Sequence, residues 1–187
     1  KLAWRSTDIT KFDYLGAGQV VIQKFTQPTT DVQYTLATGA GSNPYAGMDR
    51  FGRVVDLQWN QGSVELVRLK YGYDRSSSKL YQRDEVARTN GATFDELYGY
   101  DGLQRLGSYD RGELNGTNSG ISGSPTLTQN WTLDSTGNWN NYQQGVVDAL
   151  NQDRTHNTVN EITGITETVG LAWSTPADDA NGNMTTI

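Results

Sequence analysis

The 187-residue sequence contains no cysteine and a single histidine, His156. Without cysteine there can be no disulfide, no thiolate zinc ligand and no cysteine nucleophile. A Ser–His–Asp arrangement would have to use His156 as its base. We therefore predict no transition-metal site, and we expect stability to come from hydrogen-bonded strands and packed rings.

Positive charge and long apolar runs are also scarce. The formal net charge is −6, with 15 Lys and Arg against 21 Asp and Glu, and binding a phosphate backbone needs a basic face. No apolar run approaches the roughly 20 residues that span a bilayer. We expect neither a nucleic-acid partner nor membrane insertion. The chain starts at Lys1 without an initiating Met or a signal peptide, so we expect a piece of a larger protein.

Aromatic residues and glycine are abundant instead. Only 35% of residues are apolar, yet there are 5 Trp, 10 Tyr and 21 Gly. Large rings can supply burial in a thin core, and glycine favours frequent turns. Apolar and polar residues alternate over Val67–Tyr73, which is typical of a half-buried antiparallel strand. The composition and this alternation predict an all-β protein of short strands and tight turns.

A six-copy pattern recurs along the chain around an Asp or Asn, which we call the anchor. A turn residue stands three positions after the anchor, a polar residue four after it and an apolar residue five after it. The copies at Asp74 and Asn157 fit this spacing least well. The anchors are Asp49, Asp74, Asp101, Asp134, Asn157 and Asp179.

Each copy is predicted to form a β-hairpin. The anchor side chain can bond its own backbone two residues on, and Gly or Asn three residues later tolerates positive φ. Rings one and three positions before the anchor share a strand face. Because one hairpin is marginal in water, consecutive hairpins should pair side by side into a sheet.

The spacing also predicts how the chain is divided. Residues 1–44 carry the pattern least clearly and are predicted to be divergent N-terminal strands, followed by about six hairpin repeats over 45–187. Residues 112–124, rich in Gly, Ser and Asn, are predicted to form an extended loop. Tyr142–Asn151 has apolar residues that a short helix could use, although Gly145 disfavours one.

The sequence resembles the YD-repeat units of RHS proteins, a family that includes the teneurins, from about Tyr45 to its end. The resemblance rests on Tyr71–Asp74, Tyr98–Asp101, Asp49–Val54, Asp179–Met184, and Arg154–Asn157 with Asn160–Thr163. It implies a curved or spiralling β-sheet of YD repeats, which in full-length relatives closes into a hollow shell around a C-terminal toxin or other cargo. It also implies a secreted or cell-surface parent. The segment at which such proteins cleave themselves is missing here, so that chemistry is not carried over.

Three groups of residues are candidates for a catalytic site. His156 lies inside a repeat unit, immediately before the anchor, and is interpreted as structural. Asp95 with Glu96, and Asp178 with Asp179, could pair as in glycoside hydrolases, but sequence neighbours on a strand point to opposite faces. We predict no catalytic, cofactor-binding or metal residue, and no enzyme.

Two further patterns leave alternatives open. Asp178–Asn183 has alternating oxygen-bearing residues like a calcium loop, but it lacks the bidentate Glu of an EF-hand, and the repeat predicts a plain turn there. The aromatic residues either form a buried sheet face or leave a few exposed rings as a platform for glycans.

The sequence therefore favours a structural repeat, used as part of a β-shell, stalk or self-assembling fibre. Its expected partners are other copies of itself, through exposed strand edges, or the rest of a larger RHS-type chain. The alternative is a carbohydrate-binding module that uses exposed Trp and Tyr, with a glycan as partner.

Overall fold

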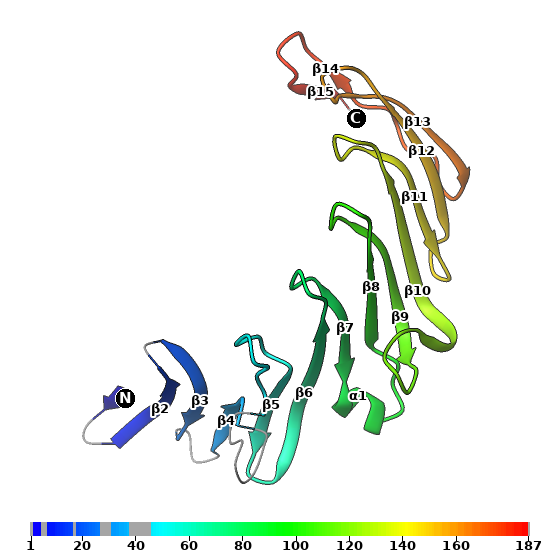
Figure 1. Cartoon of the computed structure of the whole chain (residues 1–187). Coiled ribbons are helices and arrows are strands. Elements are labelled where there is room, and N and C mark those ends of the chain that lie inside the picture. The colour runs from blue at the N-terminus through cyan, green and yellow to red at the C-terminus, as the bar shows by residue number, and fades with distance from the viewer. Residues whose placement is uncertain (1, 5–6, 17, 27–30, 38–45, 187) are drawn as a thin grey trace. The chain divides into compact units, whose positions relative to one another are not determined.

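The computed structural model describes residues 2–4, 7–16, 18–26, 31–37 and 46–186 (Figure 1). The chain divides into two compact units, residues 1–95 and 96–187. The predicted boundary at residues 44 and 45 lies outside the described residues. Each unit is taken by itself below.

The first unit is a sheet whose strands follow one another in chain order, each antiparallel to its neighbour. An isolated bridge between Met48 and Val54 closes the Asp49 turn ahead of the fifth strand. The strands are β1 (Leu2–Trp4), β2 (Thr7–Leu15), β3 (Gln19–Phe25), β4 (Val32–Thr35), β5 (Asp56–Gln61), β6 (Val64–Tyr73) and β7 (Lys79–Asp84).

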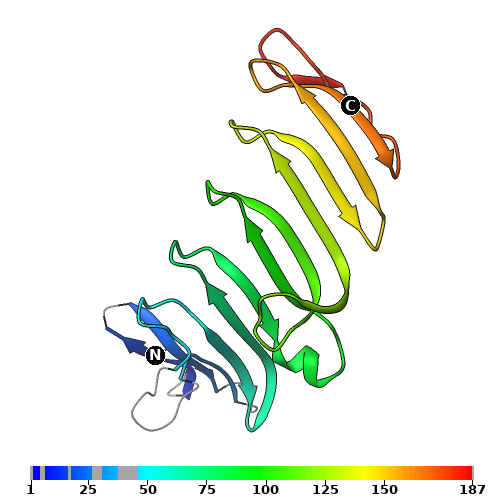
Figure 2. The same cartoon turned by 45° about the vertical axis from the view of Figure 1, so that its right-hand side comes forward.

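A short helix, α1 (Glu85–Thr89), follows β7 (Figure 2). The Asp84 side chain caps it by accepting from the Ala87 amide at 2.9 Å, as a favourable N-cap residue does. Within the described residues, no helix is long and apolar enough to cross a membrane.

The second unit continues the same construction, with strands in chain order and antiparallel pairing. A separate two-stranded sheet ends the described chain. The strands are β8 (Asp95–Tyr100), β9 (Leu106–Leu114), β10 (Ile121–Leu133), β11 (Trp139–Gly145), β12 (Leu150–His156), β13 (Ile162–Val169), β14 (Ala177–Asp178) and β15 (Met184–Thr186). The predicted all-β array of antiparallel hairpins is confirmed.

Two local predictions in the second unit are corrected. The expected loop over 112–124 is mostly strand, because β9 runs to Leu114, β10 starts at Ile121, and only 115–120 turn. The possible helix over Tyr142–Asn151 is wrong, since β11 and β12 pair across that segment. Cross-strand pairing outweighs the local preference in both places.

Each sheet is a single layer with little fully buried apolar surface. Among the described apolar residues, only Val21, Leu36 and Leu114 are completely buried. Rings pack against one another along one face instead, with the Tyr34 and Trp59 centroids 5.4 Å apart and those of Trp131 and Tyr142 5.7 Å apart. Such pairs add stabilisation beyond their buried area.

The face opposite the rings in the second unit contains three pairs in which a glycine faces a Ser or Thr. Gly145 stands beside Thr128, where an added Cβ would lie 2.6 Å from the Thr128 Oγ1. Gly99 faces Ser108 and Gly164 faces Thr155 in the same way. The hydroxyl on one strand therefore occupies the space that glycine leaves on the next.

Candidate functional site: the anchor turns and the Trp139 depression

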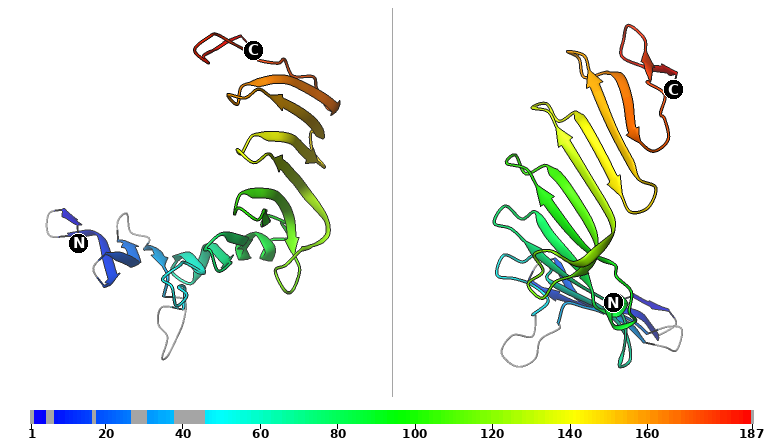
Figure 3. Two further views of the ribbon diagram at one scale, coloured as in Figure 1. Left: turned by 45° about the horizontal axis from the view of Figure 1, so that its top comes forward. Right: turned by 90° about the vertical axis from the view of Figure 1, so that its right-hand side faces the viewer.

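The six predicted anchors all form the same turn. In each, the anchor N–H donates to the carbonyl four residues later, and the N–H three residues later donates back to the anchor carbonyl. The Asp101 turn is typical, with 2.9 Å from its N–H to the Arg105 carbonyl and 3.0 Å from the Gln104 N–H to the Asp101 carbonyl. In the second unit, the turns at Asp101, Asp134 and Asn157 lie at the same end of their strands (Figure 3, right).

The anchor side chain organises the turn from inside. Asp134 Oδ1 accepts from the backbone N–H groups of Thr136 and Asn138 at 2.8 and 2.9 Å. The residue three after each anchor has φ between 61° and 98°, the left-handed region that favours Gly and Asn. These residues are Gly52, Ser77, Gln104, Gly137, Asn160 and Gly182. The predicted turn geometry is confirmed, including the copies at Asp74 and Asn157.

A seventh turn of this type was missed. Asn115 Oδ1 accepts from the N–H groups of Thr117 and Ser119, both at 3.1 Å, and Asn118 has φ of 55°. Its closing bond joins the Asn115 N–H to the Gly120 carbonyl, one residue farther than in the other copies. The extra residue, in a segment rich in Gly and Ser, hid the anchor in the sequence.

In three copies, the residue four after the anchor links its turn to the next one. Arg53 donates to the Asp49 carboxylate and also to the Asp74 carbonyl, at 2.7 and 2.9 Å. Arg105 does the same, with 2.7 Å to the Asp101 carboxylate and 2.6 Å to the Asp134 carbonyl. We call these contacts the turn ladder.

An asparagine continues the turn ladder in the next copy. The Asn138 amide donates to its own anchor, Asp134, at 2.9 Å and to Asn160 Oδ1 at 2.8 Å. Arg and Asn can both serve at this position, because each offers several N–H donors on one planar group.

Hydrogen bonds in the turns lower the pKa of Asp134, Asp101 and Asp179. Donation from the Asn138 side chain, helped by Thr136, holds the pKa of Asp134 well below its ordinary range. The Arg105 backbone and side chain lower the pKa of Asp101, and Asn183 does so for Asp179. Hydrogen bonds to the charged form favour ionisation. These carboxylates are therefore ionised and bonded within their own turns.

The two carboxylates of the first candidate pair, Asp95 and Glu96, make separate contacts. Asp95 is fully buried, accepting from the Asp84 N–H at 2.9 Å and pairing with Arg88 at 2.5 Å. Glu96 instead accepts from the Tyr109 and Tyr98 hydroxyls, the former at 3.0 Å. The Tyr98 pKa is strongly raised by burial and by Glu96.

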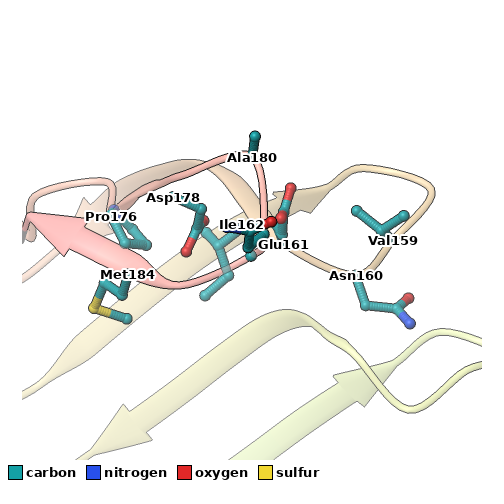
Figure 4. A pocket seen from close by; sticks show the side chains of 10 residues that line it. Val159, Asn160, Glu161, Ile162, Pro176, Asp178, Ala180 and Met184 are labelled. Atoms are coloured by element: carbon teal, nitrogen blue, oxygen red, sulfur yellow. The ribbon is translucent and has the colours of Figure 1, made fainter.

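The second pair also separates. Asp179 is an anchor whose oxygens accept from Asn181 and Asn183, which is the plain turn predicted as an alternative to a calcium loop. Asp178 lines a cavity of about 600 Å³ together with Glu161 from the preceding turn (Figure 4). Among the described residues, no group of three or more His, Cys, Asp or Glu could hold a metal ion.

Trp139 is a partly exposed ring with polar side chains around it. It is 40% exposed and stacks on Tyr142, with centroids 5.7 Å apart, while the Arg154 guanidinium lies 5.0 Å from its centroid. A depression of about 270 Å³ opens beside it. The depression is lined by Gly137, Asn138, Trp139, Arg154, His156, Asn160 and Ile162. The sequence did not single out this grouping, because it joins β11, β12, β13 and two turns.

The fold and its turns define the class: a single-layer array of antiparallel β-hairpins with a shared anchor turn. No protein-family model matches the sequence, and no curated protein matches it. Among solved structures, the chain is similar to one in the "Crystal Structure of TcdB2-TccC3-Cdc42", with a TM-score of 0.54 and 18% identity. The match covers 86% of this chain and 8% of that one, so the described chain spans only a small part of it. At this identity the similarity concerns the fold alone.

Proposed function

We propose that this chain is a structural segment of an RHS/YD-type repeat protein, in which the hairpins form part of a wall. The observation that carries the proposal is the repeated anchor turn with its turn ladder. Hydrogen bonds run from each of three turns to the next turn of the same array, and they are donated by Arg53, Arg105 and Asn138. Such nearest-neighbour linkage is the stabilising principle of repeat arrays.

The wall would belong to a β-shell, a stalk or a self-assembling fibre of a secreted or cell-surface protein. The YD motifs and the fold shared with a much longer chain support this. Its partners would be other parts of a larger RHS-type chain or further copies of itself, through unpaired strand edges.

Light scattering and negative-stain electron microscopy of the purified chain, over a range of concentrations and without ligand, test this role. We expect concentration-dependent, end-to-end assemblies. A monodisperse monomer at all concentrations would contradict self-assembly. The hypothesis that the chain is a wall segment of a larger chain would then be tested by adding further repeats of that chain. These repeats should raise the thermal stability of residues 1–187.

The second candidate is carbohydrate binding through exposed rings. The specific observation in its favour is Trp139, partly exposed beside a polar depression. Glycan-array binding that disappears on replacing Trp139 would support it. Binding unaffected by this change would count against it.

A further inference from the structure

Positive charge is rare in the second half of the chain. Residues 96–187 contain three arginines and no lysine against eleven Asp and Glu, a formal net charge of −8. Arg105 pairs with Asp101 at 2.7 Å, and Arg111 lies 3.5 Å from Glu96. The third arginine, Arg154, is the exception.

Arg154 has no carboxylate partner among the described residues. Its Nε donates to the neutral Gln152 Oε1 at 2.7 Å, and its guanidinium packs over the Trp139 ring. Partial burial lowers its pKa. Desolvating a charge without a counter-charge is unfavourable, and here it happens in a region with a large excess of carboxylates.

The depression beside Arg154 contains no acidic side chain in its lining. The polar lining offers spare hydrogen-bonding capacity at Asn160. Asn160 accepts through Oδ1 from Asn138 and Thr136, which leaves its amide N–H groups to face a ligand. The volume of about 270 Å³ lies near the lower end of small-molecule sites, enough for one ring.

We propose that this depression binds an acidic sugar residue of the hexuronate class. The exposed part of Trp139 packs against the apolar face of the pyranose, and Arg154 takes its carboxylate in the two-pronged geometry that guanidinium favours. The Asn160 amide donates to a ring hydroxyl. The site does not depend on the structural role of the array. It gives the carbohydrate-binding candidate a location and a charge preference.

The test is a titration of the full chain with sodium glucuronate and with methyl glucoside, followed by the Trp139 indole signal in NMR spectra. Glucuronate should bind at least about tenfold more tightly, the worth of one charge-assisted bond. Arg154→Gln should abolish this preference, while Arg154→Lys should retain part of it because the charge remains. Circular dichroism checks that each variant is folded.

Two matched controls are available. Arg111→Gln removes a paired arginine from the same unit, and Trp173→Phe alters a tryptophan that is 51% exposed and outside the depression. Both should leave glucuronate binding unchanged.

Several results would overturn the proposal: no binding of glucuronate, equal binding of the two sugars, or unchanged glucuronate binding in Arg154→Gln. Sodium acetate and a glutamate-containing peptide serve as carboxylates without a sugar ring. Binding of either as tightly as glucuronate would show that the site recognises a carboxylate without the sugar ring, and would overturn the proposal as well. Because the titration is independent of the assembly measurement, failure here leaves the structural role standing.

Discussion

Arg105 reaches from its own turn to the backbone carbonyl of Asp134, 29 residues farther along, and donates a hydrogen bond to it at 2.6 Å. The same guanidinium holds the Asp101 carboxylate at 2.7 Å. One side chain thereby closes one hairpin and fastens it to the next. Arg53 repeats the arrangement in the first unit, where it joins Asp49 to Asp74.

Replacing Arg105 with alanine should loosen the neighbouring turn. Loss of the bond to the Asp134 carbonyl should destabilise the second unit by about 1 kcal/mol, because the side chain is only partly shielded from water. Hydrogen exchange of the amides of residues 134–138 should accelerate. Arg75→Ala is the control: Arg75 is exposed, so it should change stability by less than about 0.5 kcal/mol. Equal effects of the two changes would contradict the turn ladder.

Glycine at the third position after the anchor should make the folded chain more stable than other residues do. Gln104 has φ of 61° without being glycine, and the left-handed region costs other residues about 1–2 kcal/mol. Gln104→Gly should therefore stabilise the chain by up to about 1 kcal/mol, after the extra backbone entropy of glycine is subtracted. Gly137→Ala, at φ of 98° where an added Cβ would meet Arg105 Nη1 at 4.0 Å, an ordinary van der Waals contact, should destabilise by a similar amount. Urea denaturation measures both, and the same sign for the two changes would refute this account.

Acid should weaken the array through its anchors. The pKa of Asp134 is lowered in the folded chain by Asn138 and Thr136, so below the ordinary Asp value near 4 the unfolded chain takes up protons first. The stabilisation is complete at neutral pH and falls as the pH drops below about 4.

Asp134→Asn separates the charge from the turn. Asn157 and Asn115 already serve as anchors through Oδ1, so this variant should keep the turn and lose part of the acid sensitivity. Asp134→Ala should lose the turn at all pH values. Thermal unfolding followed from pH 7 to pH 2 distinguishes them. An unchanged pH slope in Asp134→Asn would count against the anchor as its source.

The last link of the turn ladder can be rebuilt. Glu161 occupies the position of Arg105 in the Asn157 turn, where it accepts from its own anchor and cannot donate to the Asp179 turn. The cavity of about 600 Å³ separates the two turns instead. Combining Asn157→Asp with Glu161→Arg recreates the Asp101–Arg105 pair and should slow hydrogen exchange over residues 179–184. Glu161→Gln alone is the control, since its shorter amide should give a smaller effect. Faster exchange in the double variant would contradict the inference.

Much of the hairpin array could be predicted from local chemistry. An Asp or Asn that bonds its own backbone, followed three residues later by Gly or Asn, is a turn signal contained in a few consecutive residues. The same signal at Asn115 was missed because that turn is one residue longer. The helix after Asp84 was missed because five residues give too little periodicity to detect, although its cap was visible.

The sequence by itself determined the hairpins, because each turn depends on residues within five positions of its anchor. Only the tertiary structure decided which turn accepts the hydrogen bond from Arg53, from Arg105 and from Asn138. These partners are more than twenty residues apart in the sequence, and the strand register brings them together. The tertiary structure also decided that Arg154 meets Trp139 rather than a carboxylate. Neither residue carries that information locally, because the contact exists only when β12 pairs with β11 in the observed register.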